Sequence, residues 1–536
     1  MPEVREHRFP NGFQILCAER PGTGSFQARL VIRGGRADTG PLPAGAAVLL
    51  ARTLFGPILP EEVGAEHGFE ALLKQEEGAF EALRLERIRR TRQKGEDSSE
   101  ALGLAQLQAQ HLAELKRRVE ASAAQDPLEA LGATRREATC GADEIAFGLE
   151  LPAKAFESWC RLERQYLQRM ALFRFPLERE RLIQELGSGK LEAEEALSVL
   201  LGTAFTGHPY AQALDLRRES LEGLSWSELR AFARGLCSPE RMTLILVGDV
   251  RLGAALPVLE STFGALPAIS EGQARRSDRG GAMLQAPGYR RLQASTGGES
   301  HVFVAWHIPA ANHPDEPALE VVARALGGSK GSRLVRRIQE ERGLASSLTV
   351  RVGVPGGRDS SLLVIEARPS EGHGLVELEE AIQGEILRIQ RESFSEEELR
   401  GALRQMETES LMVQEDAASL AMALGRAVTQ SGDWRQAFRA QNLGRELTLE
   451  EIQAVARRYL VPAQGITALL GADPLLAPRD PLEEKLGRVL TTLVQRKLED
   501  PAQAETVVRE TLRQLRMLSL QEREQTLKLL EAQAAS

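Results

Sequence analysis

The side chains that most often bind metals or perform catalysis are sparse in this sequence and are not grouped. The histidines show neither an HxxxH nor an HxxEH spacing, which would place two imidazoles on one helical face. His301 and His307 share one face of a predicted strand. They are six residues apart, which in a strand corresponds to about 20 Å, too far for both to bind one ion. We therefore expect a structural or surface role for each histidine. They are His7, His67, His111, His208, His301, His307, His313 and His373.

Other common catalytic patterns are also missing from the sequence. The cysteines Cys17, Cys140, Cys160 and Cys237 form no CxxC pair, so we expect isolated buried thiols rather than a zinc ribbon or a redox dithiol. The glycine-rich stretch 327–332 lacks the GxxxxGK[ST] order of a phosphate-binding loop. No GxSxG nucleophile motif occurs. No local motif therefore predicts a reaction by itself.

Length and composition limit the class of protein. A chain of 536 residues predicts two to four domains, and 42% hydrophobic with 27% charged residues is typical of a soluble globular protein. The net charge of −9 argues against a dedicated nucleic-acid-binding protein. No apolar run reaches the roughly 18–20 residues of a membrane span, and no signal peptide is visible. We expect a cytoplasmic location for the sequence as it stands, or a periplasmic one if an export signal has been removed.

The most informative pattern is an internal repeat. The stretch Leu224–Pro239 aligns without a gap with Leu447–Pro462, 223 positions later. Each begins with Ser or Thr followed three residues on by Glu, the signature of a helix capping box, and each ends at a proline before a β-rich run. A weaker match relates Leu50–Gly56 to Val322–Gly328, 272 positions later. The offsets of 272 and 223 differ by 49, so the first half carries an insert of about that length.

The composition indicates where this insert lies. A stretch at about 61–128 is rich in Glu, Lys, Arg, Gln and Ala, and it predicts a protruding helical hairpin. The hairpin is either a solvated charged arm or an arm that binds a partner. We expect an N-terminal α+β domain at 1–266, a linker at 267–287, a homologous domain at 288–474 and a charged helical tail at 475–536.

Seven short stretches carry a characteristic pattern of glycines, prolines and apolar residues. They are Asn11–Leu16, His208–Tyr210, Leu224–Asp249, Phe263–Pro267, Gly327–Gly328, Ser332–Leu334 and Glu341–Ala345. Their order and spacing resemble the insulinase-like M16 metallopeptidase family, in the short-chain bacterial branch of the group that includes mitochondrial processing peptidase. The resemblance covers roughly residues 7–474. It implies an α+β protein with two homologous domains, each an antiparallel sheet packed with helices.

The resemblance also implies where a metal site belongs. Active members of the family bind zinc through an HxxEH motif, whose glutamate is the general base, and a glutamate on a later helix completes the ligand set. Here Val48 and Arg52 stand at the two histidine positions and Ala51 at the general base. Glu185 remains at the third-ligand position and Glu178 at the supporting one. One carboxylate cannot hold zinc at useful affinity, so we expect neither zinc nor another cofactor.

The second half lacks the family's other catalytic pair. In active relatives an arginine and a tyrosine seven residues apart help to bind the substrate and the tetrahedral intermediate, and here Gln339 and Ser346 stand at these positions. We further hypothesise that Arg52 occupies the vacated metal position and pairs with Glu185, since a buried carboxylate without a partner is unfavourable. The alternative is that Arg52 points to solvent and Glu185 pairs elsewhere.

These substitutions predict a non-catalytic M16 homologue, a pseudopeptidase that acts as a partner or scaffold subunit. Its expected partner is another M16-like chain, in a homodimer or a heterodimer. Two alternatives stay open. One is a zinc-dependent metalloendopeptidase, active alone or completed by a partner chain, and the other is a protein that binds peptides along a sheet edge without cutting them.

Overall fold

The structure, a computed structural model, describes most but not all of the chain. The described ranges are 2–54, 68–93, 99–123, 126–186, 192–268, 288–295, 299–441 and 447–471, with isolated positions between and after them. The chain divides into two compact units, residues 1–292 with 301–469, and residues 293–300 with 470–536. Nearly all of the predicted linker, and all but isolated positions of the predicted tail, lie outside the described residues.

The first half is built on a six-stranded sheet. Its strands are β1 (Val4–Arg8), β2 (Gln14–Glu19), β3 (Ser25–Arg33), β4 (Thr134–Cys140), β5 (Glu144–Pro152) and β6 (Met242–Gly248). They lie in the order β1-β2-β6-β3-β5-β4. All neighbours run antiparallel except β2 and β6, which are parallel, so the sheet is mixed where a purely antiparallel one was expected. A parallel neighbour is possible because the chain between β2 and β6, which includes three further strands and the helices that follow β5, returns to the end of the sheet where β2 began.

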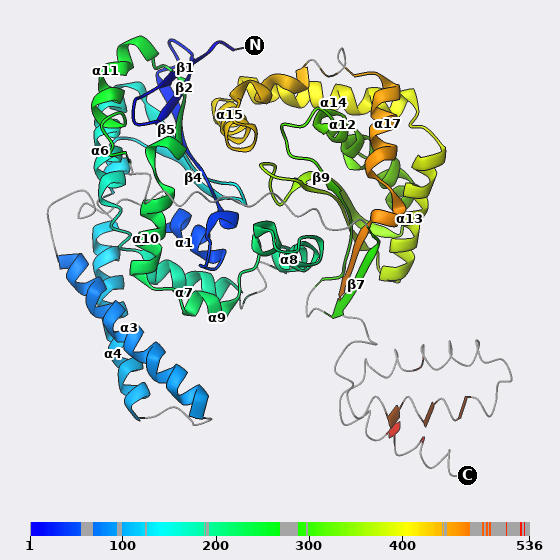
Figure 1. Cartoon of the computed structure of the whole chain (residues 1–536), viewed down its shortest axis with the longest axis horizontal. Helices are drawn as coiled ribbons and strands as arrows, with labels where there is room; N and C mark the ends of the chain where they lie inside the picture. The colour runs from blue at the N-terminus through cyan, green and yellow to red at the C-terminus, as the bar shows by residue number, and fades with distance from the viewer. Residues whose placement is uncertain are drawn as a thin grey trace. The chain divides into compact units, whose positions relative to one another are not determined.

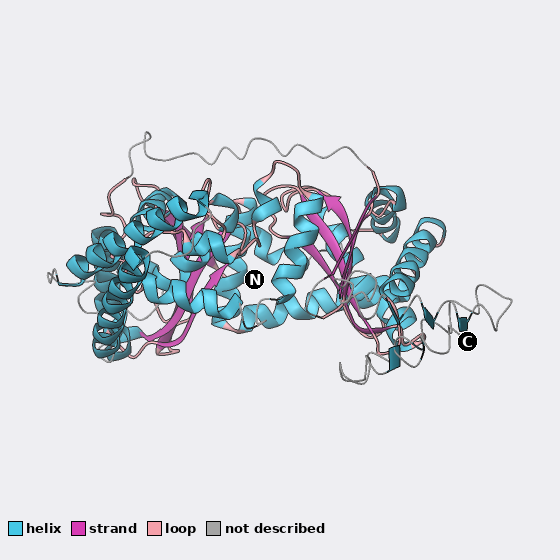
Figure 2. Ribbon diagram, turned by 90° about the horizontal axis from the view of Figure 1, so that it is seen from below, coloured by secondary structure: helices cyan, strands magenta, loops and turns pink. Residues whose placement is uncertain are grey.

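Helices cover one face of this sheet and bury the main hydrophobic core (Figure 2). They include α1 (Gly45–Leu54), α6 (Phe156–Arg169), α7 (Phe175–Leu186), α9 (Arg218–Glu222), α10 (Trp226–Leu236) and α11 (Leu252–Thr262), with the short helices α5 (Pro127–Ala130) and η2 (Ala153–Ala155). The other helices of this half are α8 (Glu192–Ala204), η1 (Arg36–Asp38), η3 (Pro209–Gln212) and η4 (Pro239–Arg241). Every residue of α1 except Arg52 is buried. Tertiary packing rather than helix propensity alone therefore holds α1 in place.

The opposite face of the same sheet is covered by α15 (Ala417–Ser431), a helix from the second half of the chain. Its residue Leu420 lies in one buried cluster with Ile245 of β6. At Gly425 the helix approaches the sheet so closely that a Cβ atom would lie 2.8 Å from Val31 Cγ2. The two halves of the first unit therefore share a hydrophobic core.

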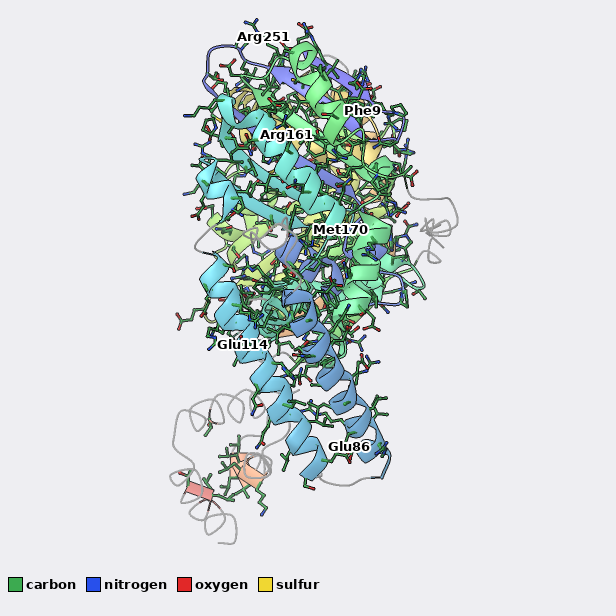
Figure 3. All side chains as sticks on the ribbon, turned by 90° about the vertical axis from the view of Figure 1, so that its left-hand side faces the viewer. Phe9, Glu86, Glu114, Arg161, Met170 and Arg251 are labelled. Atoms are coloured by element: carbon green, nitrogen blue, oxygen red, sulfur yellow. The ribbon has the colours of Figure 1, made fainter. Side chains whose placement is uncertain are left out.

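The predicted insert forms two long helices, α3 (Gly68–Gln93) and α4 (Ser99–Ala123), which lie side by side and extend away from the sheet (Figures 1 and 3). Glu76, which is 1% exposed, holds the pair near its base. Its Oε1 accepts hydrogen bonds from Gln108 Nε2 at 3.1 Å and from Arg179 Nη2 of α7 at 3.3 Å. The prediction of a helical hairpin is confirmed.

The second half is built on a five-stranded sheet in the order β7-β11-β8-β10-β9. Its strands are β7 (Arg290–Ser295), β8 (His301–Ile308), β9 (Ala345–Val354), β10 (Ser361–Pro369) and β11 (Ile466–Gly471). Its further helices are α12 (Glu316–Gly327), η5 (Val335–Glu340), α13 (Leu375–Arg391), α14 (Glu396–Glu415), η6 (Trp434–Gln441), α17 (Leu449–Tyr459) and η7 (Pro462–Gln464). One hydrophobic cluster joins β8 and β10 to α12, α13, α14 and α17, so this half repeats the sheet-and-helix plan of the first. The predicted α+β class with two such halves is confirmed.

The capping boxes that revealed the repeat are formed in both halves. At the start of α10 the Ser225 side chain accepts from the Glu228 N–H at 3.2 Å, while the Glu228 carboxylate accepts from the Ser225 N–H at 2.9 Å. At the start of α17, Thr448 and Glu451 repeat these contacts at 3.2 and 2.8 Å. Each box satisfies two backbone N–H groups that a helix start leaves unpaired, which explains why this local pattern marks equivalent helices.

The four cysteines are all free, as predicted, and three of them are buried. Burial raises the pKa of the Cys17 and Cys237 thiols to about 12. These thiols are therefore protonated at neutral pH and are poor nucleophiles.

Glu163 of α6 is a buried carboxyl group in the first core. Its side chain is 2% exposed, and burial raises its pKa to about 7, although the nearby Arg136 guanidinium opposes this shift. Because the folded-state pKa lies above the unfolded value of about 4.3, the folded state binds this proton more tightly. The free energy of unfolding should therefore fall as the pH rises from about 4.5 to 7.

Glu163→Gln should remove this pH-dependent penalty. We expect the variant to be more stable than the wild type by about 1–3 kcal/mol at pH 8, and close to it at pH 4.5, where both chains carry a neutral group. Urea denaturation at the two pH values measures the difference. Equal stabilisation at both pH values would show that the charge of Glu163 is not the cause.

Candidate metal position

The helix that the sequence assigned to the metal site, α1, presents no metal-binding atom at the three aligned positions. Val48 and Ala51 are 6% and 3% exposed and carry only hydrocarbon side chains. Arg52 carries a guanidinium, which is a permanent cation and has no acceptor atom. Helix α1 packs directly against α7, the helix that carries Glu178 and Glu185. The structure therefore brings the five sequence-predicted positions of the first half onto two packed helices.

The ion pair hypothesised from the sequence is present between these helices. Arg52 Nη2 lies 2.7 Å from Glu185 Oε2 and donates a hydrogen bond to it. The two side chains are 29% and 24% exposed, so water reaches the pair only partly. A charge-assisted contact of this length is stronger than a neutral hydrogen bond. The guanidinium therefore occupies the place beside Glu185 where a cation is required.

Glu178, at the supporting position, is neutralised from its own neighbourhood. Its Oε1 atom lies 2.7 Å from Arg174 Nη2 and 3.9 Å from Arg181 Nη1, and its side chain is 8% exposed. Both contacts are formed by arginines close in sequence, three or four residues away. Glu178 is therefore a buried carboxylate already paired with cations.

The residues at this position do not fit a zinc ion. Three protein ligands are needed for a catalytic zinc site, and α1 offers none beside Glu185. Throughout the described ranges, no three His, Cys, Asp or Glu side chains are grouped as a metal would require. A bound dication would also be repelled by the Arg52 guanidinium, which lies within hydrogen-bonding distance of the one carboxylate that remains.

The second half contains a matching ion pair that the sequence analysis missed. Arg324 Nη2 of α12 lies 2.8 Å from Glu409 Oε2 of α14, so it links two helices as Arg52 and Glu185 link α1 and α7. The sequence repeat had aligned Arg324 with Arg52. Its partner could have been found as well, because Glu409 follows Glu185 by 224 positions, within one residue of the offset between the two capping boxes.

Gln339 and Ser346 lie together but provide no catalytic group. Gln339 Nε2 donates to the Ser346 carbonyl oxygen at 3.5 Å, and the Ser346 hydroxyl lies 3.3 Å from the carbonyl oxygens of Arg368 and Pro369. Neither side chain carries the positive charge or the phenol that the active family uses. The pair instead joins η5 to the start of β9.

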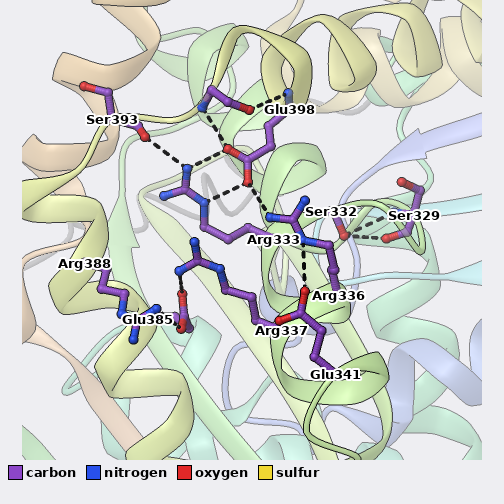
Figure 4. A network of polar contacts seen from close by, with 11 residues as sticks. Ser329, Ser332, Arg333, Arg336, Arg337, Glu341, Glu385, Arg388, Ser393 and Glu398 are labelled. Carbon is purple, nitrogen blue, oxygen red and sulfur yellow. Dashed lines mark hydrogen bonds and ion pairs between the residues drawn. The ribbon is translucent and has the colours of Figure 1, made fainter.

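Arginines do occur beside this position, but carboxylates hold them (Figure 4). Arg333 Nη2 lies 2.6 Å from Glu398 Oε2 in a pair that is almost fully buried. Arg337 Nη1 lies 2.8 Å from Glu385 Oε2. Each of these guanidiniums is therefore oriented by an acidic partner within the second half.

The histidines make structural contacts. His307 Nε2 lies 3.0 Å from the carbonyl oxygen of Ala204 at the end of α8, and burial lowers its pKa. His301 is 1% exposed, with its Nδ1 3.3 Å from Glu366 Oε1. These contacts agree with the structural role predicted for them.

The sequence and the fold both match proteins of one peptidase family. The family model described as the peptidase M16 inactive domain matches residues 224–406. An uncharacterized zinc protease of Mycobacterium leprae is 25% identical over 294 residues, a match that covers 55% of this chain and 65% of that protein. One from Streptomyces coelicolor is 23% identical over 292 residues, covering 53% of this chain and 59% of that protein. These matches span less than two thirds of the relatives' own length.

Solved structures extend the similarity in fold. A protease from Helicobacter pylori superposes with a TM-score of 0.66 at 15% identity, covering 88% of this chain and 100% of that one. A peptidase M16 inactive domain from Pseudomonas fluorescens gives 0.64 at 17% identity, covering 88% and 98%. The two sheet-and-helix halves thus define a protein of the two-domain metallopeptidase fold. In sequence and in fold the chain is similar to proteins of the M16 peptidase family.

Restoring the ligands should restore metal binding. The triple variant Val48→His, Ala51→Glu, Arg52→His supplies two imidazoles beside Glu185, and we expect it to retain about one zinc per chain after dialysis. Elemental analysis of the purified protein measures this. Adding Glu185→Gln to the triple variant should remove most of the zinc. A folded triple variant with no more zinc than the wild type would show that α1 does not lie at the metal position.

Proposed function

We propose that this protein is a non-catalytic M16 homologue that acts as a partner or scaffold subunit of another M16-like chain. The observation that carries the proposal is the 2.7 Å pair between Arg52 and Glu185. An arginine side chain stays protonated at neutral pH, so it cannot act as a general base, and it offers no open coordination position for water. Without a metal-bound water and a base, this position cannot hydrolyse a peptide bond as active relatives do.

The hairpin supports a role in protein binding. Its far parts expose large apolar side chains to solvent, with Leu85 61% and Leu102 57% exposed. A groove of about 760 Å³ lies between α3 and the pair α7 and α9. Ile88 and Ile183 line it from opposite sides, among arginines and glutamates that also form its walls, so the groove offers both apolar and charged contacts. On this proposal the hairpin is the partner-binding arm.

A second candidate is a zinc-dependent endopeptidase, alone or completed by a partner chain. The relatives in Mycobacterium leprae and Streptomyces coelicolor that bear the name zinc protease favour it. A third is a protein that binds extended peptides without cleavage. The edge strand β4 favours this, because it borders the first sheet with most of its residues exposed or half-exposed, and such an edge can accept an added strand.

Metal content and peptidase activity separate the first candidate from the second. We expect the purified chain to contain far less than one zinc per molecule and to leave unstructured protein substrates uncut, with or without added zinc. Mass spectrometry of the digests and elemental analysis measure both. Stoichiometric zinc, or cleavage that a chelator abolishes and that Glu185→Gln removes, would contradict the proposal.

Binding to an M16 chain with an intact HxxEH motif tests the partner role. We expect co-elution in size-exclusion chromatography, and we expect Leu85→Glu with Ile88→Glu to weaken it at least tenfold by placing charges in an apolar contact. Leu387→Glu on α13 is the matched control, because Leu387 is 46% exposed and lies far along the chain from the hairpin. Unchanged binding by the hairpin variant would exclude the hairpin as the contact, and no co-elution with any such chain would exclude the partner role.

A further inference from the structure

A short loop of the second half, Pro355–Asp359, inserts among buried polar groups of the first half. The loop connects β9 to β10. Arg358 Nη2 donates to Asp38 Oδ1 at 2.7 Å, and these side chains are 14% and 1% exposed. The backbone N–H of Arg358 donates to Asp143 Oδ2 at 3.0 Å. Both the side chain and the backbone of one residue are therefore bound by carboxylates of the other half.

The groups that receive the loop are themselves fixed. The Tyr210 hydroxyl donates to Asp143, with its oxygen 2.9 and 2.8 Å from the two carboxylate oxygens, and it accepts from the Asp359 N–H at 3.3 Å. A Cβ atom at Gly356 would lie 2.1 Å from Asp143 Oδ2 and 2.9 Å from the Tyr210 hydroxyl. The loop can lie this close to Asp143 and Tyr210 only because residue 356 has no side chain.

The receiving groups belong to segments that lead to the candidate metal position. Asp38 ends η1, seven residues before α1 begins, and its second oxygen accepts from the Gly35 N–H at 2.9 Å. In the same short helix, Arg36 Nη1 lies 2.6 Å from Glu194 Oε2 of α8. The loop of the second half thus binds the stretch from which α1 starts.

The halves also meet through α15, where the chemistry differs. Leu420 and its neighbours on α15 are buried against the first sheet, and this contact excludes water from apolar groups. Such an apolar contact can be lost only by exposing hydrocarbon surface to water. The hydrogen bonds of the loop are instead exchanged for hydrogen bonds to water on release, so their net loss is smaller than their gross strength. The loop contact is therefore the one that can open, while the apolar contact of α15, its Thr429–Glu144 hydrogen bond and the His307–Ala204 contact stay closed.

We propose that Pro355–Asp359 is a releasable latch between the two halves, that α15 is their permanent hinge contact, and that release of the latch loosens the start of α1. The observation behind this proposal is the insertion of one glycine-containing loop among Asp38, Asp143 and Tyr210. The proposal does not depend on whether the protein binds zinc or a partner.

Gly356→Ala tests the latch without removing a charge, because its Cβ atom would collide with Asp143 and force the loop out. Gly384→Ala on α13 is the matched control, since no atom outside the helix's own backbone lies within 4 Å of its Cβ position. Hydrogen–deuterium exchange of the full chain is the measurement. We expect exchange to become about tenfold faster at residues 36–44 and 141–144 in Gly356→Ala but not in the control, with α15 still protected.

Arg358→Gln provides a second variant, with a smaller increase expected in the same peptides because one ion pair is lost while the backbone contacts remain. Unchanged exchange at 36–44 and 141–144 in both variants would overturn the proposal. Equal loss of protection in α15 would also overturn it, because the two contacts would then open as one unit. Loss of far-UV circular dichroism in both variants would show that the loop is an indispensable part of the fold rather than a latch.

Discussion

The Glu185 carboxylate of α7 faces α1 and is stabilised there by a positive charge. The remaining features of the candidate metal position depend on which group supplies that charge. In this protein the partner is Arg52, 2.7 Å from Glu185. A zinc ion in this place would neutralise the same carboxylate and, in addition, keep one position open for water. The guanidinium fulfils only the first role, because its charge is fixed and it donates hydrogen bonds without accepting any. On the proposed function, the position keeps the electrostatic balance of a metal site without its chemistry.

The second half of the chain contains a similar ion pair between two helices. Arg324 and Glu409 join α12 to α14 at 2.8 Å, in the place that corresponds by repeat to Arg52 and Glu185. Two copies of one structural plan thus use the same side-chain types to bridge equivalent helices. An arginine–glutamate pair therefore bridges such helices at both places, in addition to the apolar packing between α12 and α14.

The features that were predictable from the sequence have local causes. The capping boxes at Ser225 and Thr448 are set by residues three positions apart, and the hairpin helices by composition over tens of residues. The pairing of Arg52 with Glu185 could be inferred only because the family resemblance placed both residues at one site. The parallel pairing of β2 with β6 was not predicted, because it depends on the path of the chain through more than 200 residues between them.

Contacts between the halves were also beyond sequence reasoning. Arg358 and Asp38 are 320 positions apart, and nothing near either residue in the sequence indicates the other. Gly356 has the same property, because the reason for a glycine there is the Asp143 carboxylate and not the conformation of its own turn. Covering of the first sheet by α15 likewise depends on tertiary packing, since an apolar helix face does not specify which sheet it will meet.

Helix α1 is therefore restrained near both ends by ion pairs of different origin. Near its last turn, Arg52 is held by Glu185 of the same half, and seven residues before its first turn Asp38 is held by Arg358 of the other half. In an active relative such restraints would serve to place ligands around a metal within a fraction of an ångström. Here α1 carries Val48, Ala51 and Arg52 at those places and is buried except for Arg52, so the same restraints fix the packing of α1 in the core rather than the position of ligands. A protein whose position for chemistry is filled by a salt bridge, but whose helices are still held this closely, is suited to binding another chain by shape, which is the physical basis of the proposed partner role.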